Sequence, residues 1–249
     1  MLRSLCLIIV SFIFTINSFS QTITTSAISG SPFCAGASVN VPYTITGSFN
    51  SDNAFTVQLS DASGGFSSPV NISAPFNSTS AGTITATIPA TQSSGTGYRI
   101  RVVSSSPSVT GSNNGTNLTI NALGLNAPTF TGTTFCAGTS FTLNYTITNS
   151  CAFSTGNVFS AELSNASGVF SSPVTIGTSS VATGSGNFSV SIPANTATGS
   201  GYRIRVVSSN PAGITSPINA SALTINALGI NAPTITGGTT SFVRGRLSP

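Results

Sequence analysis

The residues that could do chemistry in this sequence are few, and the most regular of them are two pairs of arginines. The chain of 249 residues has seven arginines, no lysine, no histidine and three acids. The stretch GYRIRVVSS occurs at 97–105 and again at 201–209, and each copy carries two arginines separated by one residue. Neighbouring guanidinium groups can bind an anionic glycan through charge-assisted hydrogen bonds. The candidate surface-binding residues are therefore Arg99, Arg101, Arg203 and Arg205.

The same inventory of residues disfavours catalysis. Without histidine there is no Ser-His-Asp or Cys-His arrangement and no imidazole metal site. The three acids, Asp52, Asp61 and Glu162, are scattered, which argues against a paired-carboxylate glycosidase site or a carboxylate-rich calcium site. We therefore expect no enzyme activity, no catalytic residue, no metal site and no cofactor.

The arginine pairs also have a structural interpretation, which we favour over glycan binding. Apolar residues alternate with the arginines, so a strand would bury the apolar side chains and point both arginines outward. The expected neighbouring strand carries FTVQLS, whose Gln58 becomes Glu162 in the second copy and would lie opposite both arginines of that copy. The arginine stems would then cover the sheet surface while their heads bond across the strands.

Three cysteines follow the N-terminal segment, and their pairing is open. Cys136 and Cys151 could form a disulfide, which needs Cα atoms within about 7 Å. The strand expected between them, residues 140–147, would hold its ends about 25 Å apart at roughly 3.3 Å per residue, so only a sharp bulge would allow the bond. Cys34 has no partner in its own repeat. The alternative that we favour is that these cysteines are unpaired thiols at strand edges.

Residues 1–20 have the pattern of a secretory signal peptide. Arg3 precedes a short apolar run from Leu5 to Phe14, and Ser18-Phe19-Ser20 is a small-x-small cleavage pattern. The apolar run is too short to span a bilayer, and no other run is longer, so we expect an exported mature chain without a membrane span. Arg244 and Arg246 lie near the C-terminus, and the body of the chain has a net charge of only +1. It has no basic cluster or aromatic platform of the kind that binds nucleic acid.

The body of the chain is a tandem repeat. SPFCAGASVNVPYTIT at 31–46 matches TTFCAGTSFTLNYTIT at 133–148, and LTINALGLNAPT at 118–129 matches LTINALGINAPT at 223–234. The offset between copies grows from 102 to 105 residues, with the extra residues falling between the matching blocks. We expect repeat 1 at 21–124, repeat 2 at 125–231 and the truncated start of a third repeat at 232–249.

Each repeat is expected to be a sandwich of about seven short strands. Apolar and polar residues alternate in short runs bounded by Gly, Asn, Ser and Pro, and no run has the helical period. The predicted fold class is all-β, with two tandem immunoglobulin-like β-sandwiches; a jelly roll or closed barrel is the rival. In the immunoglobulin fold a tyrosine lies two residues before the second core cysteine. Tyr98 and Tyr202 fit the tyrosine position and Ile100 and Ile204 the cysteine position, so all four are predicted to be buried structural residues.

At the level of motifs, the chain resembles a known class of repeats. FCAGTS…YTIT, LS-[DN]-ASG-x-FSSPV, SGTGYRIRVVSS-x-P and LTINAL are similar to the immunoglobulin-like repeats of secreted Bacteroidota surface proteins, which are exported by the type IX system and are adhesin- or gliding-motility-like. The resemblance covers residues 21 to about 240. It implies a secreted or cell-surface, non-catalytic and modular protein. The C-terminal sorting domain of that family has no counterpart in this sequence.

Two functions from different classes remain as hypotheses. The first is a spacer or adhesin-type structural module. The second is a module that binds carbohydrate or protein, with surface glycans or other extracellular proteins as partners, through the loops or the outward arginines. Binding loops usually expose aromatic or arginine anchors, and the candidate aromatic anchors are Phe49, Phe76 and Phe153.

Overall fold

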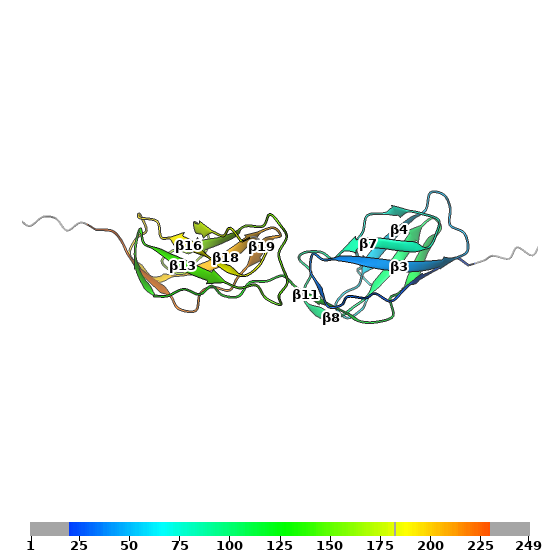
Figure 1. Cartoon of the computed structure of the whole chain (residues 1–249), viewed down its shortest axis with the longest axis horizontal. Helices are drawn as coiled ribbons and strands as arrows, with labels where there is room; N and C mark the ends of the chain where they lie inside the picture. The colour runs from blue at the N-terminus through cyan, green and yellow to red at the C-terminus, as the bar shows by residue number, and fades with distance from the viewer. Residues whose placement is uncertain (1–19, 182, 230–249) are drawn as a thin grey trace, which may run out of the picture. The chain divides into compact units, whose positions relative to one another are not determined.

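In the computed structural model the described part of the chain covers residues 20–181 and 183–229 (Figure 1). Apart from Ser20, the predicted signal peptide lies outside the described residues, and so does the predicted third repeat at 232–249. Within the described ranges the regular structure is all β-strand. No helix in that part of the chain is long and apolar enough to cross a membrane.

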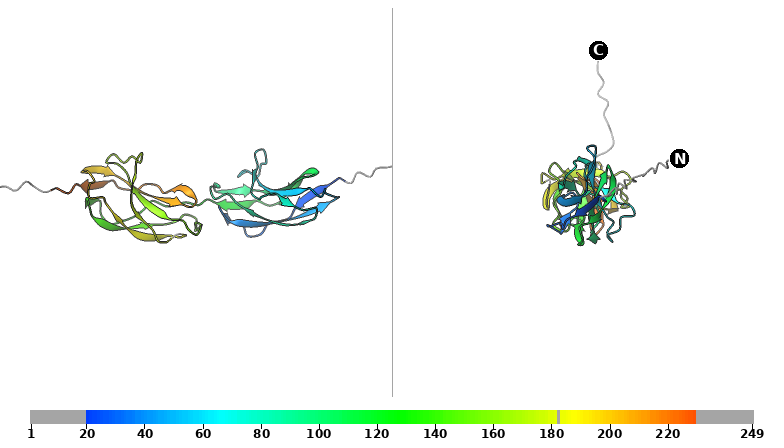
Figure 2. Two further views of the ribbon diagram at one scale, coloured as in Figure 1. Left: turned by 90° about the horizontal axis from the view of Figure 1, so that it is seen from above. Right: turned by 90° about the vertical axis from the view of Figure 1, so that its right-hand side faces the viewer.

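The chain divides into two compact units. One short segment of the second sequence repeat belongs to the unit formed by the first repeat. Unit 1 contains the residues up to Gly124 together with Ile147–Gly156, and unit 2 contains Leu125–Thr146 and the residues from Asn157 onward. The segment 147–156 belongs to repeat 2 by sequence, but it packs with repeat 1. Figure 2 shows, for each unit by itself, strands on opposite sides of an interior.

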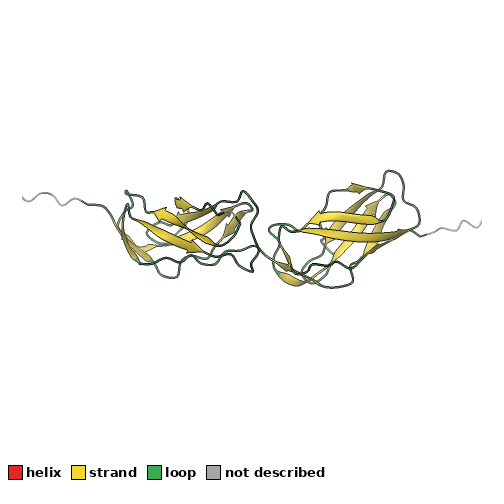
Figure 3. Cartoon of the chain, in the orientation of Figure 1, coloured by secondary structure: helices red, strands yellow, loops and turns green. Residues whose placement is uncertain are grey.

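The described residues of unit 1 form eleven strands, most of them short (Figure 3). They are β1 (Thr22–Thr25), β2 (Phe33–Cys34), β3 (Ser38–Thr46), β4 (Ala54–Leu59), β5 (Val70–Asn71), β6 (Phe76–Asn77), β7 (Gly82–Thr87), β8 (Gly95–Tyr98), β9 (Ile100–Ser105), β10 (Ser108–Asn113) and β11 (Leu118–Asn121).

The main sheet of unit 1 curls around its interior. The order is β5-β4-β9-β10-β1-β3-β7, with β6 also paired to β4. Strand β1 pairs antiparallel with β3 on one side and parallel with β10 on the other, so it links the two faces of the sheet. A second sheet, β2-β11-β8, contains the parallel pair β2–β11. The β3–β7 pair and the β8–β11 pair are labelled in Figure 1.

Unit 2 repeats most of this arrangement, with nine strands in the part of it that the structure describes. They are β12 (Thr134–Cys136), β13 (Ser140–Tyr145), β14 (Phe159–Leu163), β15 (Val174–Thr178), β16 (Gly186–Ser191), β17 (Gly199–Tyr202), β18 (Ile204–Ser209), β19 (Ala212–Thr215) and β20 (Leu223–Asn226). The sheets are β12-β20-β17, β13-β16 and β15-β14-β18-β19. Where unit 1 has β1, unit 2 has a single bridge between Thr129 and Asn144.

The interior of each unit is filled by every second residue of its strands, because successive side chains of a strand point to opposite faces. An aromatic pair lies at the same place in both cores, with Tyr43 and Phe55 4.8 Å apart between ring centroids and Tyr145 and Phe159 also 4.8 Å apart. The largest fully buried side chains are Tyr98, Tyr145, Phe55, Phe159, Leu59, Ile88, Ile100, Leu118, Ile120, Leu143, Leu163 and Ile192.

Candidate functional site

Arg101 lies on strand β9 and is held by a residue of the neighbouring strand and by a ring from the loop that follows that strand. Gln58 on β4 is its direct partner in the strand register, and Arg101 Nε donates to Gln58 Oε1 at 2.9 Å. The guanidinium carbon lies 4.3 Å from the centroid of the Phe66 ring, which is cation–π geometry. Partial burial lowers the pKa of Arg101, but the guanidinium stays charged at neutral pH.

Arg205 on β18 has the same arrangement in unit 2, with a charged partner. Glu162 on β14 is opposite Arg205 in the register, and Nε donates to Glu162 Oε2 at 2.8 Å. The Arg205 guanidinium lies 4.4 Å from the centroid of the Phe170 ring. The two side chains are 27% and 18% exposed, so this ion pair is partly shielded from water.

Arg99 and Arg203 have different partners from their neighbours in the motif. Each lies in the gap between two strands, β8 and β9 or β17 and β18, which belong to different sheets. Arg99 Nε donates to Asn117 Oδ1 at 2.9 Å, whereas Arg203 Nη1 donates to the carbonyl oxygens of Asn219 and Ala220 at 2.9 and 3.0 Å.

The expectation that Glu162 faces both arginines of its copy is therefore wrong for Arg203. The break between strands β17 and β18 places Arg203 and Arg205 in different hydrogen-bonding surroundings. The two guanidinium groups of one motif hydrogen-bond to different partners. They are therefore not preorganised to bind one anion together.

The two tyrosines of the motif are buried, and each bonds to the loop just before it. Tyr98 is 1% exposed, and its hydroxyl donates to the carbonyl oxygen of Ser93 at 2.9 Å and accepts from Gln92 Nε2 at 2.9 Å. The Tyr202 hydroxyl donates to the carbonyl oxygen of Ala197 at 2.9 Å. Ile100 and Ile204 are fully buried.

Buried asparagines fasten the chain at equivalent places in both units, and the sequence analysis missed them. Asn53 Oδ1 accepts from the backbone N–H groups of Ser105 and Ser106 at 3.2 and 3.0 Å, and its Nδ2 donates to Ser78 O at 2.8 Å. Asn157 Oδ1 accepts from two consecutive backbone N–H groups in unit 2, both at 2.9 Å. The signal in the sequence is that these asparagines occupy matching positions in the two repeats.

A second pair of buried asparagines bonds to the strand that follows each tyrosine. Asn114 Oδ1 accepts from the N–H of Ile100 at 2.9 Å, and Asn219 Oδ1 accepts from the N–H of Ile204 at 2.6 Å. Each side chain thereby takes the place of a strand residue and satisfies a buried backbone group.

The cysteine predictions are corrected by the structure. Cys34 and Cys151 form the disulfide, with an S–S distance of 2.05 Å and a Cα–Cα distance of 5.5 Å, and Cys136 is an exposed free thiol. The Cys136–Cys151 bond, which the sequence left as a possibility, is absent because strand β13 separates the two residues, and the favoured alternative of unpaired thiols is wrong for Cys34 and Cys151. The partner of Cys34 comes from segment 147–156, which packs on repeat 1 although it is 117 positions away along the chain.

Segment 147–156 is held on unit 1 by the backbone as well as by the disulfide. The N–H of Thr148 donates to Gly124 O at 2.9 Å, and Asn149 Nδ2 donates to Ala122 O at 3.4 Å. Asn149 and Ser150 both have a φ of 54°, in the left-handed region that non-glycine residues rarely occupy. A cavity of about 460 Å³ lies beside the disulfide. Its lining residues are Cys34, Ala35, Gly36, Ala37, Leu123, Ser150, Ala152, Phe153 and Ser154.

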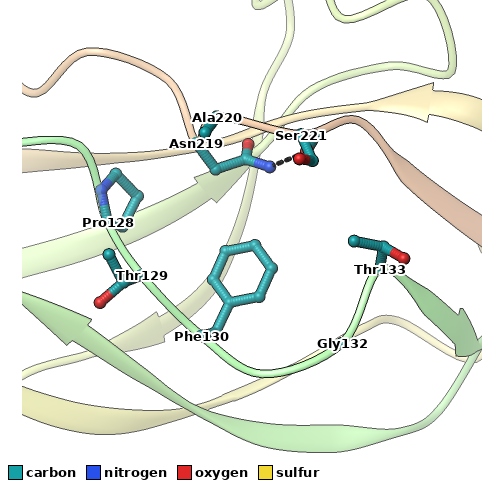
Figure 4. Close-up of a pocket in the computed structure, with 8 residues that line it drawn as sticks. All are labelled: Pro128, Thr129, Phe130, Gly132, Thr133, Asn219, Ala220 and Ser221. Atoms are coloured by element: carbon teal, nitrogen blue, oxygen red, sulfur yellow. Dashed lines mark hydrogen bonds between the residues drawn. The ribbon is translucent and has the colours of Figure 1, made fainter.

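Two further pockets lie in the described part of unit 2. One of about 170 Å³ is shown in Figure 4, where the Phe130 ring projects between two loops and Asn219 Nδ2 donates to Ser221 O. It is smaller than the roughly 300–1,000 Å³ that is typical of ligand pockets. Another of about 350 Å³ is bounded in part by Tyr202 and Asn165. Neither is lined by a charged side chain.

The candidate aromatic anchors of the loops are mostly inside the protein. Phe49 and Phe153 are buried, and the Phe49 ring packs 5.2 Å from that of Phe55 in the core. Phe76 is half exposed, on strand β6. Phe49 and Phe153, two of the three candidate anchors, therefore pack in the interior and are not exposed for ligand contact.

Comparison with known proteins adds little to this description. No protein-family model matches the chain, and no curated protein matches it. One of the solved structures that is similar is the BSP domain of a biofilm associated protein, with 12% sequence identity and a TM-score of 0.24. The match covers 83% of this chain and 30% of that chain, so this chain spans less than a third of that protein's length. A likeness of this degree carries no argument about function.

Proposed function

We propose that this chain is a non-catalytic structural module of an exported, surface-associated protein, in which two tandem immunoglobulin-like sandwiches act as spacers. The observation that carries the proposal is the position of Arg101 and Arg205. These repeated charges are each stacked on a phenylalanine ring and bonded to the residue opposite in the neighbouring strand. Charge used in this way stabilises and solubilises a sheet surface instead of presenting a ligand site.

The sandwich assignment is supported by the strand order and by the tyrosine. In unit 1, β1, β3 and β7 form one face and β4, β9 and β10 the other, while β2 pairs parallel with β11. A buried tyrosine whose hydroxyl bonds to the backbone a few residues upstream, as Tyr98 does, is a feature of this fold. The resemblance of the repeated motifs to Bacteroidota surface repeats points in the same direction.

Export is supported by the Cys34–Cys151 disulfide. Disulfides form and persist in oxidising compartments outside the cytosol. The signal-like residues 1–20 are the means of export in this proposal.

The experiment compares stability with binding. Arg101 and Arg205 are replaced together by threonine in one variant and by methionine, which keeps an apolar stem, in another. If the arginines are structural, the threonine variant loses about 1 kcal/mol or more per unit, the methionine variant loses less, and the parent chain does not bind acidic polysaccharide.

The competing function is an arginine cradle for an anionic glycan. It would be favoured if the parent chain bound acidic polysaccharide and both variants lost that binding with their stability unchanged. That result would overturn the spacer proposal.

A further inference from the structure

Three residues of unit 1 form the surface on which segment 147–156 docks. Cys34 supplies the disulfide to Cys151, and Leu123 is 8% exposed beside the segment, in the wall of the same cavity. Gly124 accepts a hydrogen bond from the N–H of Thr148. A Cβ at Gly124 would lie 2.5 Å from Thr148 Oγ1, so any larger residue there would force Thr148 to shift. We call these three residues the docking triad.

Unit 2 carries the same triad as Cys136, Leu228 and Gly229. The motifs FCAG and LTINALG that contain it are identical in the two repeats. Cys34 pairs with Asn121 in the β2–β11 register, and Cys136 pairs with Asn226 in the β12–β20 register.

The backbone around the two cysteines is also the same. The N–H that follows each cysteine donates to the partner strand, from Ala35 to Asn121 O at 2.9 Å and from Ala137 to Asn226 O at 2.8 Å. The triad of unit 2 is therefore built on the same frame as the triad of unit 1.

The two triads differ in what covers them. Leu228 is 63% exposed, against 8% for Leu123, and Cys136 is exposed and free. A Cβ at Gly229 would meet no atom within 4 Å, so nothing in the described residues requires glycine at that position. Unit 2 has the same cysteine, leucine and glycine as unit 1. In unit 1, the partners of these three residues all belong to segment 147–156.

We propose that the triad of unit 2 is a docking site for a cysteine-bearing loop of the 147–156 type from another repeat unit, and that the bond formed is a disulfide to Cys136. The occupant is inferred from unit 1, where such a loop covers the equivalent surface. A second copy of this chain in its oxidised form is not the partner, because its Cys151 is already bonded to its own Cys34. The inference concerns a contact between repeats and does not depend on the spacer role.

The covalent step needs an external disulfide as oxidant, such as glutathione disulfide or a protein disulfide oxidoreductase. The loop cysteine first attacks this disulfide and forms a mixed disulfide, releasing one thiol. The Cys136 thiolate then attacks the loop sulfur, the mixed S–S bond breaks, and the second thiol leaves and takes up a proton. Two protein thiols are oxidised and one small disulfide is reduced.

The test is a chain that begins at Gln21, and so lacks Cys6, and that has a third repeat, made by joining residues 125–229 after Gly229. The new junction then repeats the natural one between Gly124 and Leu125. The added copy carries Cys136→Ser, so its loop cysteine cannot pair within its own repeat. After refolding in a glutathione buffer, thiols are alkylated and counted by intact mass, and the disulfides are assigned by peptide mapping.

The expected result is no alkylated thiol, with Cys34 bonded to Cys151 and Cys136 bonded to the added loop. A matched control with the added loop cysteine replaced by serine should leave Cys136 alkylated. Leu228→Asp should lower the equilibrium ratio of bonded to free Cys136 by about tenfold or more, since burial of one leucine is worth at least that factor. Alkylation of both Cys136 and the added loop cysteine, with the Cys34 bond formed, would overturn the proposal.

A second measurement decides the matter if the three-repeat chain does not fold. The full chain is offered a synthetic peptide with the sequence of residues 145–158, activated as its glutathione mixed disulfide, and in parallel a scrambled peptide with the same single cysteine. The native peptide should accumulate on Cys136 about tenfold over the scrambled one, and Leu228→Asp should abolish the preference. Equal reaction of the two peptides would mean an exposed thiol only and would reject the docking site.

Discussion

Glu162 and Gln58 occupy the same position in the two units, each opposite an arginine of the neighbouring strand. Glu162 accepts from Arg205 Nε at 2.8 Å, and Gln58 accepts from Arg101 Nε at 2.9 Å. The hydrogen bond is kept while the charge of the acceptor changes. The two units therefore form a natural pair for separating the charge of an ion pair from its geometry.

Exchange of these two acceptors should have small and opposite effects. Glu162→Gln should lower the free energy of unfolding of unit 2 by no more than about 0.2–1 kcal/mol, because the pair is partly exposed. Gln58→Glu should raise that of unit 1 by less, because the glutamate gains the charge but loses the bond that Gln58 Nε2 donates to Asn71 Oδ1 at 3.1 Å. The measurement is urea unfolding at low and high salt, and the difference should shrink at high salt. A loss above 2 kcal/mol in the glutamine variant would show that the charge matters far more than this geometry indicates.

Removal of the Tyr98 hydroxyl should destabilise unit 1. Tyr98→Phe leaves the buried packing in place and removes the bonds to Ser93 and Gln92, which should cost about 1–2 kcal/mol in the free energy of unfolding. Tyr202→Phe is the matched variant in unit 2 and should cost about 1 kcal/mol, because it removes the bond that the hydroxyl donates to Ala197 O. Chemical denaturation of the full chain would measure both, and an unchanged transition for Tyr98→Phe would argue against a structural role.

Truncation of Asn53 should be among the more damaging polar substitutions. Asn53 is fully buried and makes three hydrogen bonds to the backbone, so Asn53→Ala leaves two N–H groups and one carbonyl without their partner. The expected loss of unfolding free energy is about 2–3 kcal/mol. Asn50→Ala, at an exposed site that bonds to Ser106 Oγ, is the control and should cost less than about 0.5 kcal/mol. Equal losses for the two variants would contradict this ranking.

Stability should fall at alkaline pH because of two buried tyrosines. Burial raises the pKa of Tyr43 and of Tyr145 above the ordinary value of 10.0. Between the unfolded and folded pKa the native state binds more protons than the unfolded state, so the free energy of unfolding falls as pH rises. The contribution of the two tyrosines to the free energy of unfolding is complete below about pH 10 and is lost as the pH rises above it. Unfolding followed from pH 8 to 11 should show this decline, and Tyr43→Phe should flatten it for unit 1; a flat profile in the parent chain would refute it.

Much of the core could be predicted from the sequence, because alternation in a strand is a local property. Tyr98 and Ile100 are predicted from this alternation to be buried, as are Tyr202 and Ile204 in the second copy, and all four are buried. The pairing of β4 with β9, which places Gln58 beside Arg101, followed from the length of the repeat and the expected strand order.

The rest depended on contacts that alternation does not encode. Asn53 and Asn114 are polar residues in turn-like sequence, and only the folded chain shows that they satisfy buried backbone groups. The partner of Cys34 lies in a loop of the other repeat, where the second copy has two more residues than the first, so a search within one repeat could not find it.

The disulfide itself gives the last prediction. In the full chain, oxidised and then alkylated, chymotryptic digestion after Phe141 and Tyr145 should separate Cys136 from Cys151. The Cys151 peptide should be linked to the Cys34 peptide, and Cys136 should carry the alkyl group.

Cys151→Ser should then lower the free energy of unfolding of unit 1 by about 2–4 kcal/mol, because the bond closes a long loop in the unfolded chain. Segment 147–156 should exchange its amide hydrogens faster in that variant, since Thr148 would keep its bond to Gly124 without the covalent link beside it. Cys136→Ser is the control and should change neither quantity, because Cys136 is exposed and unbonded. A Cys136–Cys151 link in the peptide map would show that the segment does not dock on Cys34.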